Sequence, residues 1–242
     1  MQGKNILITG ASKGIGHGVA EYLLQGGANV ILVARNREKL EELRLKYPNS
    51  AFPYPYDLCK MDGIEDIFLF CKAHGLKLHG MLHAAGISID RPIKALEFEE
   101  MGQVFQVNYF SYVALTKYFL NRKYSENGSS IICMSSMASF ECAKAMSQYA
   151  ASKNAINAYT KVLAREAEKR KIRVNAIAPA LVDTDMTHQL CDVLEDFEET
   201  LITRQPFGII PVEQIAYLAE FLLSDRSAYI TGAIIPVHGG AF

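Results

Sequence analysis

The sequence has little of what marks membrane, secreted or nucleic-acid-binding proteins. No apolar run approaches the roughly 18 residues that span a bilayer, and residues 2–4 lead directly into an apolar stretch, so we expect no membrane segment and no secretory leader. Lys and Arg total 25 against 26 Asp and Glu, which argues against nucleic acid as a partner. The five cysteines form no CxxC pair, which predicts no metal site and indicates reduced, buried thiols in a cytoplasmic protein. They are Cys59, Cys71, Cys133, Cys142 and Cys191.

What the sequence does have is a regular alternation of short apolar runs and longer helical patterns. The runs predict buried strands at 5–9, 29–34, 80–85, 130–134, 174–178 and 233–237, with a further extended segment before Asp57. The helical patterns predict helices at 15–24, 37–46, 98–120, 148–169 and 212–223. No linker or repeat divides the chain. We therefore expect a single α/β domain over residues 1–242, a doubly wound Rossmann fold of about seven parallel strands with helices on both faces. A (β/α)8 barrel is the alternative, but it usually needs eight units and a longer chain.

A glycine-rich turn, TGASKGIG at residues 9–16, follows the first expected strand and leads into a helix. Glycines allow a sharp turn and a close approach of the backbone to a pyrophosphate, and the following helix points free N–H groups at the anion. An ordinary strand–turn–helix corner is the alternative explanation, which the βαβ context disfavours. The candidate cofactor contacts here are Gly10, Ser12, Lys13, Gly14, Ile15 and Gly16.

The end of the second expected strand indicates which nucleotide is bound. A ribose 2′-hydroxyl is normally held by a carboxylate at this point, whereas a 2′-phosphate prefers arginine. Here the strand ends in Ala34-Arg35, so we predict NADP(H) over NAD(H), with Arg35 as the main contact and Arg37 or Lys13 in support. The alternative is that Arg35 is a solvated loop charge. Asp57-Leu58 follows the third extended segment, where a carboxylate could accept a hydrogen bond from an adenine amino group.

The strongest chemical signal is the sequence YAASK, which places Tyr149 and Lys153 four residues apart on one helix face. An ammonium group near a phenol favours the phenolate, which brings the phenol toward the range of general acid–base catalysis. Ser136 lies at the end of an expected strand, where its hydroxyl could hydrogen-bond a substrate carbonyl. A Y-x-x-x-K pair alone is usually surface decoration. Its combination with the nucleotide turn is far more specific.

The chain resembles the short-chain dehydrogenase/reductases over essentially its whole length, and most of all the 3-oxoacyl-(acyl carrier protein) reductase branch. The matching stretches are TGASKGIG (9–16), Asn108 in VNY, Ser136 in MSSMAS, YAASK (149–153), NAIAPA (175–180) and YITG (229–232).

The resemblance implies a catalytic tetrad of Asn108, Ser136, Tyr149 and Lys153. Tyr149 would protonate the carbonyl oxygen as hydride arrives from the nicotinamide, Lys153 would also hold the nicotinamide ribose, and Asn108 would fix a water leading to solvent. Alone, Asn108 would be better explained as an asparagine satisfied by a backbone group. The resemblance also implies that Val182 and Thr184 bind the carboxamide. It adds Ala84, Gly86 and Pro179 to the cofactor contacts.

Three departures from the family pattern leave the tetrad untouched. The usual N-N-A-G is His83-Ala84-Ala85-Gly86, and a strand-end His83 is better explained by a position over an adenosine than as a catalytic base. The usual Pro-Gly is Pro179-Ala180, so this turn must avoid positive φ or accept slight strain. His17-Gly18 replaces the larger residues often found in the first helix.

Residues 187–207 are expected to form a substrate lid, because they follow the sixth strand and are long enough to close over a ligand. The acidic residues of this segment favour neutral carbonyl compounds, cyclic ketones or acyl thioesters; they are Asp192, Glu195, Asp196, Glu198 and Glu199. The basic tract 169–171 could meet an acyl carrier protein, or could simply be cations at a helix C-terminus. The pocket lining is expected to include Ile87, Ser88, Phe140, Met146 and Met186.

Three functions stay open. The favoured one is an NADPH-dependent reductase acting on a 3-oxoacyl carrier thioester or a small ketone. The second is an alcohol, sugar or steroid dehydrogenase that works mainly toward oxidation. The third is a nucleotide-binding protein without turnover, against which the intact tetrad argues. Two long helices that are apolar over a wide arc, including Ala155, Ala158 and Val162, predict a further buried face, and by the resemblance a homotetramer.

Overall fold

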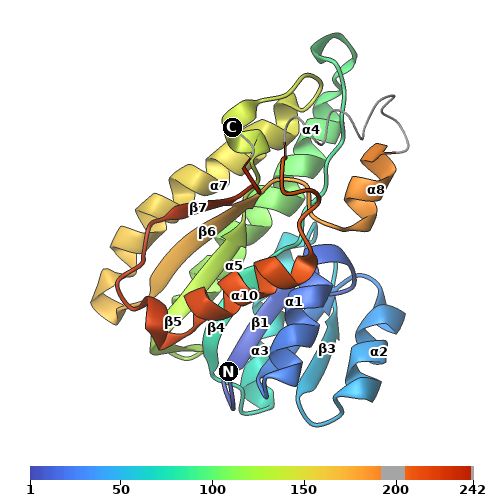
Figure 1. Cartoon of the computed structure of the whole chain (residues 1–242). Coiled ribbons are helices and arrows are strands. Elements are labelled where there is room, and N and C mark those ends of the chain that lie inside the picture. The colour runs from blue at the N-terminus through green and yellow to red at the C-terminus, as the bar shows by residue number, and fades with distance from the viewer. Residues whose placement is uncertain (192–204, 241–242) are drawn as a thin grey trace.

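A parallel sheet of seven strands forms the middle layer of the molecule, in the order β3-β2-β1-β4-β5-β6-β7 (Figure 1). The computed structural model describes the backbone of residues 1–191 and 205–240, and the side chains of these residues except 189–191. The strands are β1 (Asn5–Thr9), β2 (Asn29–Ala34), β3 (Ala51–Pro55), β4 (Leu78–His83), β5 (Ser125–Met134), β6 (Arg173–Pro179) and β7 (Ile234–Val237). The predicted doubly wound α/β fold is confirmed. The strand order reverses between β1 and β4, which is where such sheets open a crevice for a ligand.

Helices cover both faces of the sheet (Figure 1). On one face lie α1 (Gly14–Gln25), α2 (Arg37–Lys46) and α10 (Val212–Leu223). On the other lie α3 (Ile64–Ala73), α4 (Phe98–Phe105), α5 (Ser111–Phe119) and α7 (Ser147–Glu166). Two short helices, α6 (Ala138–Glu141) and α8 (Asp185–Cys191), follow β5 and β6. In the part of the chain that is described, no helix is both long and apolar enough to cross a membrane.

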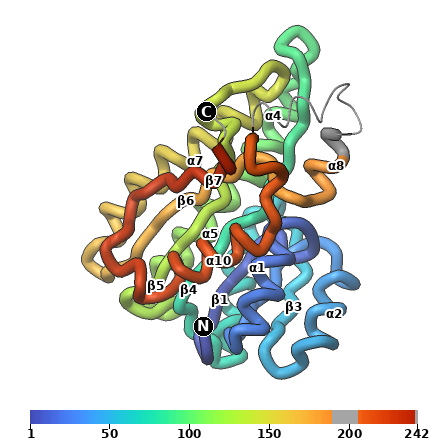
Figure 2. The backbone as a smooth tube through the Cα atoms, in the orientation of Figure 1, coloured from blue at the N-terminus to red at the C-terminus, as the bar shows by residue number. Residues whose placement is uncertain are grey.

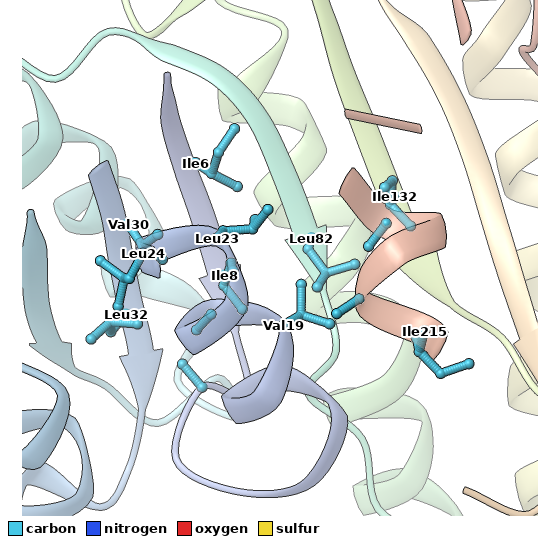
Figure 3. Close-up of a cluster of buried hydrophobic side chains, with 14 of the residues drawn as sticks. Ile6, Ile8, Val19, Leu23, Leu24, Val30, Leu32, Leu82, Ile132 and Ile215 are labelled. Carbon is cyan, nitrogen blue, oxygen red and sulfur yellow. The ribbon is translucent and has the colours of Figure 1, made fainter. Parts of the chain in front are cut away.

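Alternation along the strands explains the two layers of core. Ile6 and Ile8 of β1 point to the α1 and α10 side, whereas Leu7 between them joins the α3, α5 and α7 side. Figure 3 shows the first of these clusters, where Val19 and Leu23 of α1 lie against the strands. Because helices cover both faces, the central strands are buried on both sides, which explains why most of their residues are apolar.

The segment predicted as one helix over 98–120 contains an irregular turn. The chain continues helically from α4 to α5, but residues Gln106–Phe110 form a π-helical turn between them. The N–H of Ser111 bonds the carbonyl of Gln106, five residues back, instead of the α-helical partner four residues back. The extra residue in this turn changes the direction in which Asn108 projects.

Two arginines on the β5–β6 side of the sheet are structural. Arg173 is buried and donates hydrogen bonds to the carbonyls of Leu222 and Ser224 at the C-terminal end of α10, where a cation also complements the helix dipole. Burial lowers the pKa of its guanidinium. Arg170 donates to the carbonyl of Leu120 at 2.8 Å and to that of Ser125 at 2.7 Å, which ties the end of α7 to the start of β5.

Prolines occupy both edges of the sheet. Tyr56 donates its N–H to Ala34 of β2, so alternate residues of β3 face β2 and Pro53 and Pro55 face outward. At the opposite edge Ala180 bonds to the carbonyl of Val237, which leaves Pro236 of β7 on the outer side. The backbone trace in Figure 2 shows both edge strands, β3 near one end of the sheet and β7 near the other.

Candidate active site

A cleft of about 1090 Å³ runs across the carboxyl ends of the central strands. Its lining comes from the turns after β1, β2, β3, β4, β5 and β6 and from helix α7. This is the crevice that the reversal of strand order between β1 and β4 opens. Among the residues predicted as functional, those proposed to contact the cofactor line it except Arg37, and so do Ser136, Tyr149 and Lys153.

The turn after β1 leaves room for an anion only because it is built from glycine. Gly10 has a φ of +72°, and a Cβ there would come within 2.7 Å of the backbone nitrogen of Ala85. A Cβ at Gly16 would overlap the carbonyl of Gly10. At the start of α1 the capping position, Lys13, makes no side-chain capping bond, so the first N–H groups of this helix stay available to a ligand. The residues of this turn therefore fit a pyrophosphate.

Cations gather where the nucleotide end of the cleft opens. Arg35 and Lys13 line the cleft and are exposed, as the sequence predicts. Lys39 also lines it, while carrying an ion pair to Glu42 at 2.9 Å, whereas Arg37 does not line it. Of the two supporting cations that the sequence predicts, Lys13 is therefore placed to contact a nucleotide and Arg37 is not, while Lys39 is a further cation at this end. Asn36 caps α2 by accepting the N–H of Lys39 at 3.0 Å, and this cap sets which side chains of the first turn face the cleft.

Asp57, proposed for the adenine, lies at the same end of the cleft. One of its carboxylate oxygens accepts the N–H of Cys59 at 3.1 Å, and the residue lines the cleft. Tyr56 and Cys59, which the sequence does not single out, line the wall beside it. The aspartate is thus fixed by its own turn, a common local arrangement for this residue.

Tyr149, Lys153 and Ser136 line the cleft together, away from the cations at the nucleotide end. The Nζ of Lys153 lies 5.5 Å from the centre of the Tyr149 ring, one helical turn away on α7. Lys153 is buried, and its ammonium donates to the carbonyl of Met134 at the end of β5, at 2.7 Å. Ser136 Oγ accepts the N–H of Ala138 at 3.1 Å, so its own hydrogen is free to be donated into the cleft.

Asn108 projects from the π-helical turn and closes this end of the site from behind. Its Oδ1 accepts the N–H of Ile87 at 2.9 Å, and its Nδ2 donates to the carbonyl of Ile87 and to Ser152 Oγ, both at 3.0 Å. It is fully buried and does not line the cleft. A Cβ on Gly86 would lie 3.4 Å from Asn108 Oδ1 and 3.5 Å from Lys153 Nζ, so the two side chains flank this glycine. The side chain of Asn108 is thus fully committed within the protein.

His83 is not placed over an adenosine, and that prediction is wrong. The side chain is 1% exposed, does not line the cleft and lies on the α5 side of the sheet. Its Nδ1 is 2.8 Å from Thr9 Oγ1 and its Nε2 is 3.4 Å from Ser111 Oγ. Burial, with Lys153 nearby, lowers the pKa of the imidazole to about 3, so it stays neutral at physiological pH. A neutral ring enclosed in this way cannot serve as the base for a bound substrate.

Comparison with known proteins agrees with this geometry. A family model described as enoyl-(acyl carrier protein) reductase matches residues 10–241. The 3-oxoacyl-[acyl-carrier-protein] reductase FabG of Thermotoga maritima is 31% identical over 244 residues, which cover 99% of this chain and 98% of that protein. The enzyme of the same name from Pseudomonas aeruginosa is 32% identical over 246 residues, covering 100% and 98%. The chain belongs to the short-chain dehydrogenase/reductase family.

Solved structures of other family members have the same fold. A short-chain type dehydrogenase/reductase from Mycobacterium ulcerans superposes with a TM-score of 0.91 at 29% identity, over 99% of this chain and 90% of that one. A short-chain dehydrogenase/reductase from Brucella melitensis, described as a glucose/ribitol dehydrogenase, gives 0.93 at 26% identity over 100% and 98%. Membership makes this chain an NAD(P)-dependent oxidoreductase.

Of the other residues predicted to contact the cofactor or the substrate, some line the cleft and some do not. Ala84, Gly86, Pro179, Val182 and Thr184 all line the cleft. Ala180, which replaces the usual glycine, avoids positive φ, so the Pro179-Ala180 turn is unstrained there. Of the expected substrate-pocket lining, Ile87 and Met186 are present, but three residues do not line the cleft: Ser88, Phe140 and Met146. Gln103 and Val107 line it instead, and no local sequence signal distinguishes them from other helix residues.

The structure describes only part of the predicted lid, and it shows contacts for one residue of the basic tract. Residues Thr187–Cys191 of the expected lid continue α8, and 192–204, with all five acidic residues, lie outside the described residues. Of the tract 169–171, Arg170 is held by backbone carbonyls and is not free to meet a carrier protein. Arg170 is therefore a structural contact between the segments at Leu120 and Ser125, and the role of Lys169 and Lys171 stays a prediction.

Proposed function

We propose that this chain is an NADPH-dependent reductase that converts a ketone, in a 3-oxoacyl thioester or a small molecule, to a secondary alcohol. One observation carries the proposal. The phenol of Tyr149, with the ammonium of Lys153 5.5 Å from its ring, lines the same cleft as a glycine turn that fits a dinucleotide. Two relatives of about 30% identity are named 3-oxoacyl-[acyl-carrier-protein] reductases, which supports this substrate class.

A bound nicotinamide nucleotide would supply the hydride for this reaction. Tyr149 then acts as general acid and donates its proton to the carbonyl oxygen of the ketone. The neighbouring ammonium of Lys153 favours the phenolate that remains. Ser136 donates its free hydroxyl hydrogen to the same oxygen and stabilises the negative charge that develops there. These groups are assigned here as catalytic residues.

Lys153 and Asn108 complete the tetrad in different ways. The carbonyl of Met134 holds the ammonium of Lys153 in place, on the Tyr149 side of α7. Asn108 bonds the backbone of Ile87 and so fixes the loop after β4 against Lys153. Because the side chain of Asn108 is committed to these bonds, its contribution to a proton path would come from its backbone carbonyl.

Three exposed cations support NADPH over NADH. Arg35, Lys13 and Lys39 line the nucleotide end, and none of these positions is a carboxylate that would bind a ribose 2′-hydroxyl. A guanidinium binds phosphate oxygens with two parallel hydrogen bonds, so Arg35 is assigned as the main contact of the 2′-phosphate.

The whole chain is proposed to act as one nucleotide-binding domain, with residues 187–207 as the lid and four copies in the active assembly. Exposed apolar side chains support an assembly through the α4 and α7 side: Phe98 is 81% exposed and Val162 52%. Tyr229, just before β7, is also fully exposed. Light scattering that gives four chains is expected, and a monomer would contradict the assembly. A cytoplasmic location stays a prediction.

The function is tested by following NADPH oxidation with acetoacetyl thioesters, simple ketones and keto-sugars, with a crotonyl thioester as the control for reduction of a carbon–carbon double bond. We expect turnover of at least one ketone and none of the enoyl control. Tyr149→Phe should lower kcat about 10³-fold and leave NADPH affinity within twofold, because only the proton donor is lost. Equal turnover by Tyr149→Phe would overturn the mechanism.

A second candidate is an alcohol or sugar dehydrogenase working toward oxidation, which the likeness to the Brucella melitensis structure favours. The same assay run in reverse, with NADP+ and polyols, distinguishes the two. Faster oxidation of a polyol than reduction of any ketone at neutral pH would support this second candidate.

A further inference from the structure

His83 occupies the first position of the stretch that usually reads N-N-A-G in this family, and it is buried beside the tetrad without belonging to it. It is the last residue of β4 and stacks on Tyr112 of α5, with ring centres 5.4 Å apart. The groups around it are Thr9 from β1, Cys133 from β5 and the ammonium of Lys153 from α7. On the α5 side they are Ser111, Tyr112 and the backbone of Val107 and Asn108.

The hydrogen bonds around His83 run in one direction. Thr9 Oγ1 accepts the N–H of Ala85 at 3.3 Å, which leaves the threonine hydrogen free to be donated to His83 Nδ1 at 2.8 Å. An Nδ1 that accepts a hydrogen bond places the single proton of a neutral imidazole on Nε2. The Nε2–H then faces Ser111 Oγ at 3.4 Å.

The last link reaches the π-helical turn. Because the N–H of Ser111 bonds Gln106, the carbonyl of Val107 loses the donor that it would have in an α-helix. The hydroxyl of Ser111 replaces that donor and bonds Val107 at 2.6 Å. Ser111 can therefore only accept from His83, which agrees with a proton on Nε2. Val107 precedes Asn108, so the chain of bonds ends at the residue next to the tetrad asparagine.

We propose that His83 is a positioning residue, whose Nε2–H holds the π-helical turn, and with it Asn108, in register with the phosphate-binding turn that begins at Thr9. The asparagine common in the family at this position would reach Thr9 but not Ser111, because its amide ends where the imidazole Nδ1 lies. The link between the two ends of the cleft is thus a feature of this chain. The inference rests on the proposed function only for its kinetic test.

Two amide substitutions separate the two ends of the imidazole. His83→Gln places an amide nitrogen near the position of Nε2 and should keep the bond to Ser111, whereas His83→Asn should keep only the bond to Thr9. We expect kcat for the best ketone to fall about tenfold in His83→Asn and to stay within threefold of wild type in His83→Gln, with KM for NADPH within twofold in both. A merely space-filling role would predict the same kcat for both variants, and that result would overturn the proposal.

Tyr112→Phe is the matched control, because it alters the same buried cluster and leaves the hydrogen-bond chain intact. It should keep kcat within twofold even if its melting temperature falls. Ser111→Ala should lower kcat as His83→Asn does, and the double variant should be no slower than either single one. Additive losses would show that the two residues act separately, and would overturn the chain of bonds.

Nuclear magnetic resonance tests the geometry without any turnover. The two-bond nitrogen–proton pattern of the His83 ring should be that of the Nε2–H form, and the Asn108 side-chain amide signals should move in His83→Asn but not in His83→Gln. A proton on Nδ1, or Asn108 amide signals that are unchanged in both variants, would refute the inference. If no ketone were reduced but these signals behaved as expected, the proposed function would fail and the positioning role would stand.

Discussion

The two ends of the cleft are built from different materials. The nucleotide end is made of backbone and exposed charge: Gly10 and Gly16 leave space for an anion, and Arg35 stands free in solvent. The reaction end is made of buried side chains that bond the backbone: Lys153 to Met134 and Asn108 to Ile87. At the open end, a substitution that changes one exposed charge can change which nucleotide binds. At the enclosed end, the loss of one hydrogen bond changes the geometry of the site. Substitutions at the nucleotide end should therefore change the affinity for the nucleotide, and substitutions at the reaction end should change kcat.

Lys153 offers the most severe test of this division, because the family resemblance gives this residue of the reaction end a role in holding the nicotinamide ribose as well. Lys153→Met removes the ammonium beside Tyr149 and keeps most of the buried stem. We expect kcat to fall about 10³-fold and NADPH affinity about tenfold, measured by steady-state kinetics and by fluorescence of the bound nucleotide. Loss of NADPH affinity without loss of kcat would mean that Lys153 acts only in binding the nucleotide.

Arg35→Asp is the next test, at the open end. We expect NADPH affinity to fall 10- to 100-fold, about the contribution of a charge-assisted pair, and NADH to become the better cofactor. The matched control is Arg37→Asp, which makes the same charge change two residues along at a side chain outside the cleft lining. Similar losses in the two variants would mean that only overall charge matters there.

His83 lies between the two ends and predicts how stability depends on pH. Its pKa is about 3 in the folded chain and near 6.5 when exposed, so the unfolded chain takes up the proton first as pH falls. The free energy of unfolding should therefore decrease by about 1.4 kcal/mol per pH unit on this account, from pH 6 toward pH 3. Denaturant unfolding of wild type and His83→Gln should diverge by this slope. Parallel curves would show that the imidazole is not enclosed as described.

The smallest effect is expected where α1 packs on α10, behind the phosphate-binding turn. A Cβ at Gly18 would overlap Val212, which costs more than the helix propensity that alanine adds. Gly18→Ala should lower the free energy of unfolding by about 1 kcal/mol, measured by denaturant titration, with little change in kcat. Adding Val212→Ala should remove the clash, and failure of this second change to relieve it would point to another cause.

The nucleotide end could be predicted from sequence because its determinants are local. A glycine spacing after a strand fixes Gly10, Gly14 and Gly16, and the residue at the end of β2 names Arg35. Lys39 was missed, since the direction of a side chain in the first turn of α2 depends on the Asn36 cap and on how that helix packs. The strands and helices followed their apolar periodicity within a few residues.

The reaction end was harder to predict, because its decisive features are non-local. Periodicity runs through 98–120 without a break, so nothing in the spacing marks the π-helical turn that orients Asn108. His83 was misplaced because a lone histidine at a strand end has no pattern, and only the fold brings Thr9 and Ser111 to its two nitrogens. Tyr149, Lys153 and Ser136 were found from their spacing and Asn108 through the family resemblance, and the roles assigned to all four remain predictions.

The outward-facing prolines of β3 and β7 limit how copies of this chain can associate. At Pro53, Pro55 and Pro236 the outer edges lack the N–H that a neighbouring strand would need, so hydrogen bonding cannot continue from one molecule to the next. Self-association must then rely on contacts between side chains.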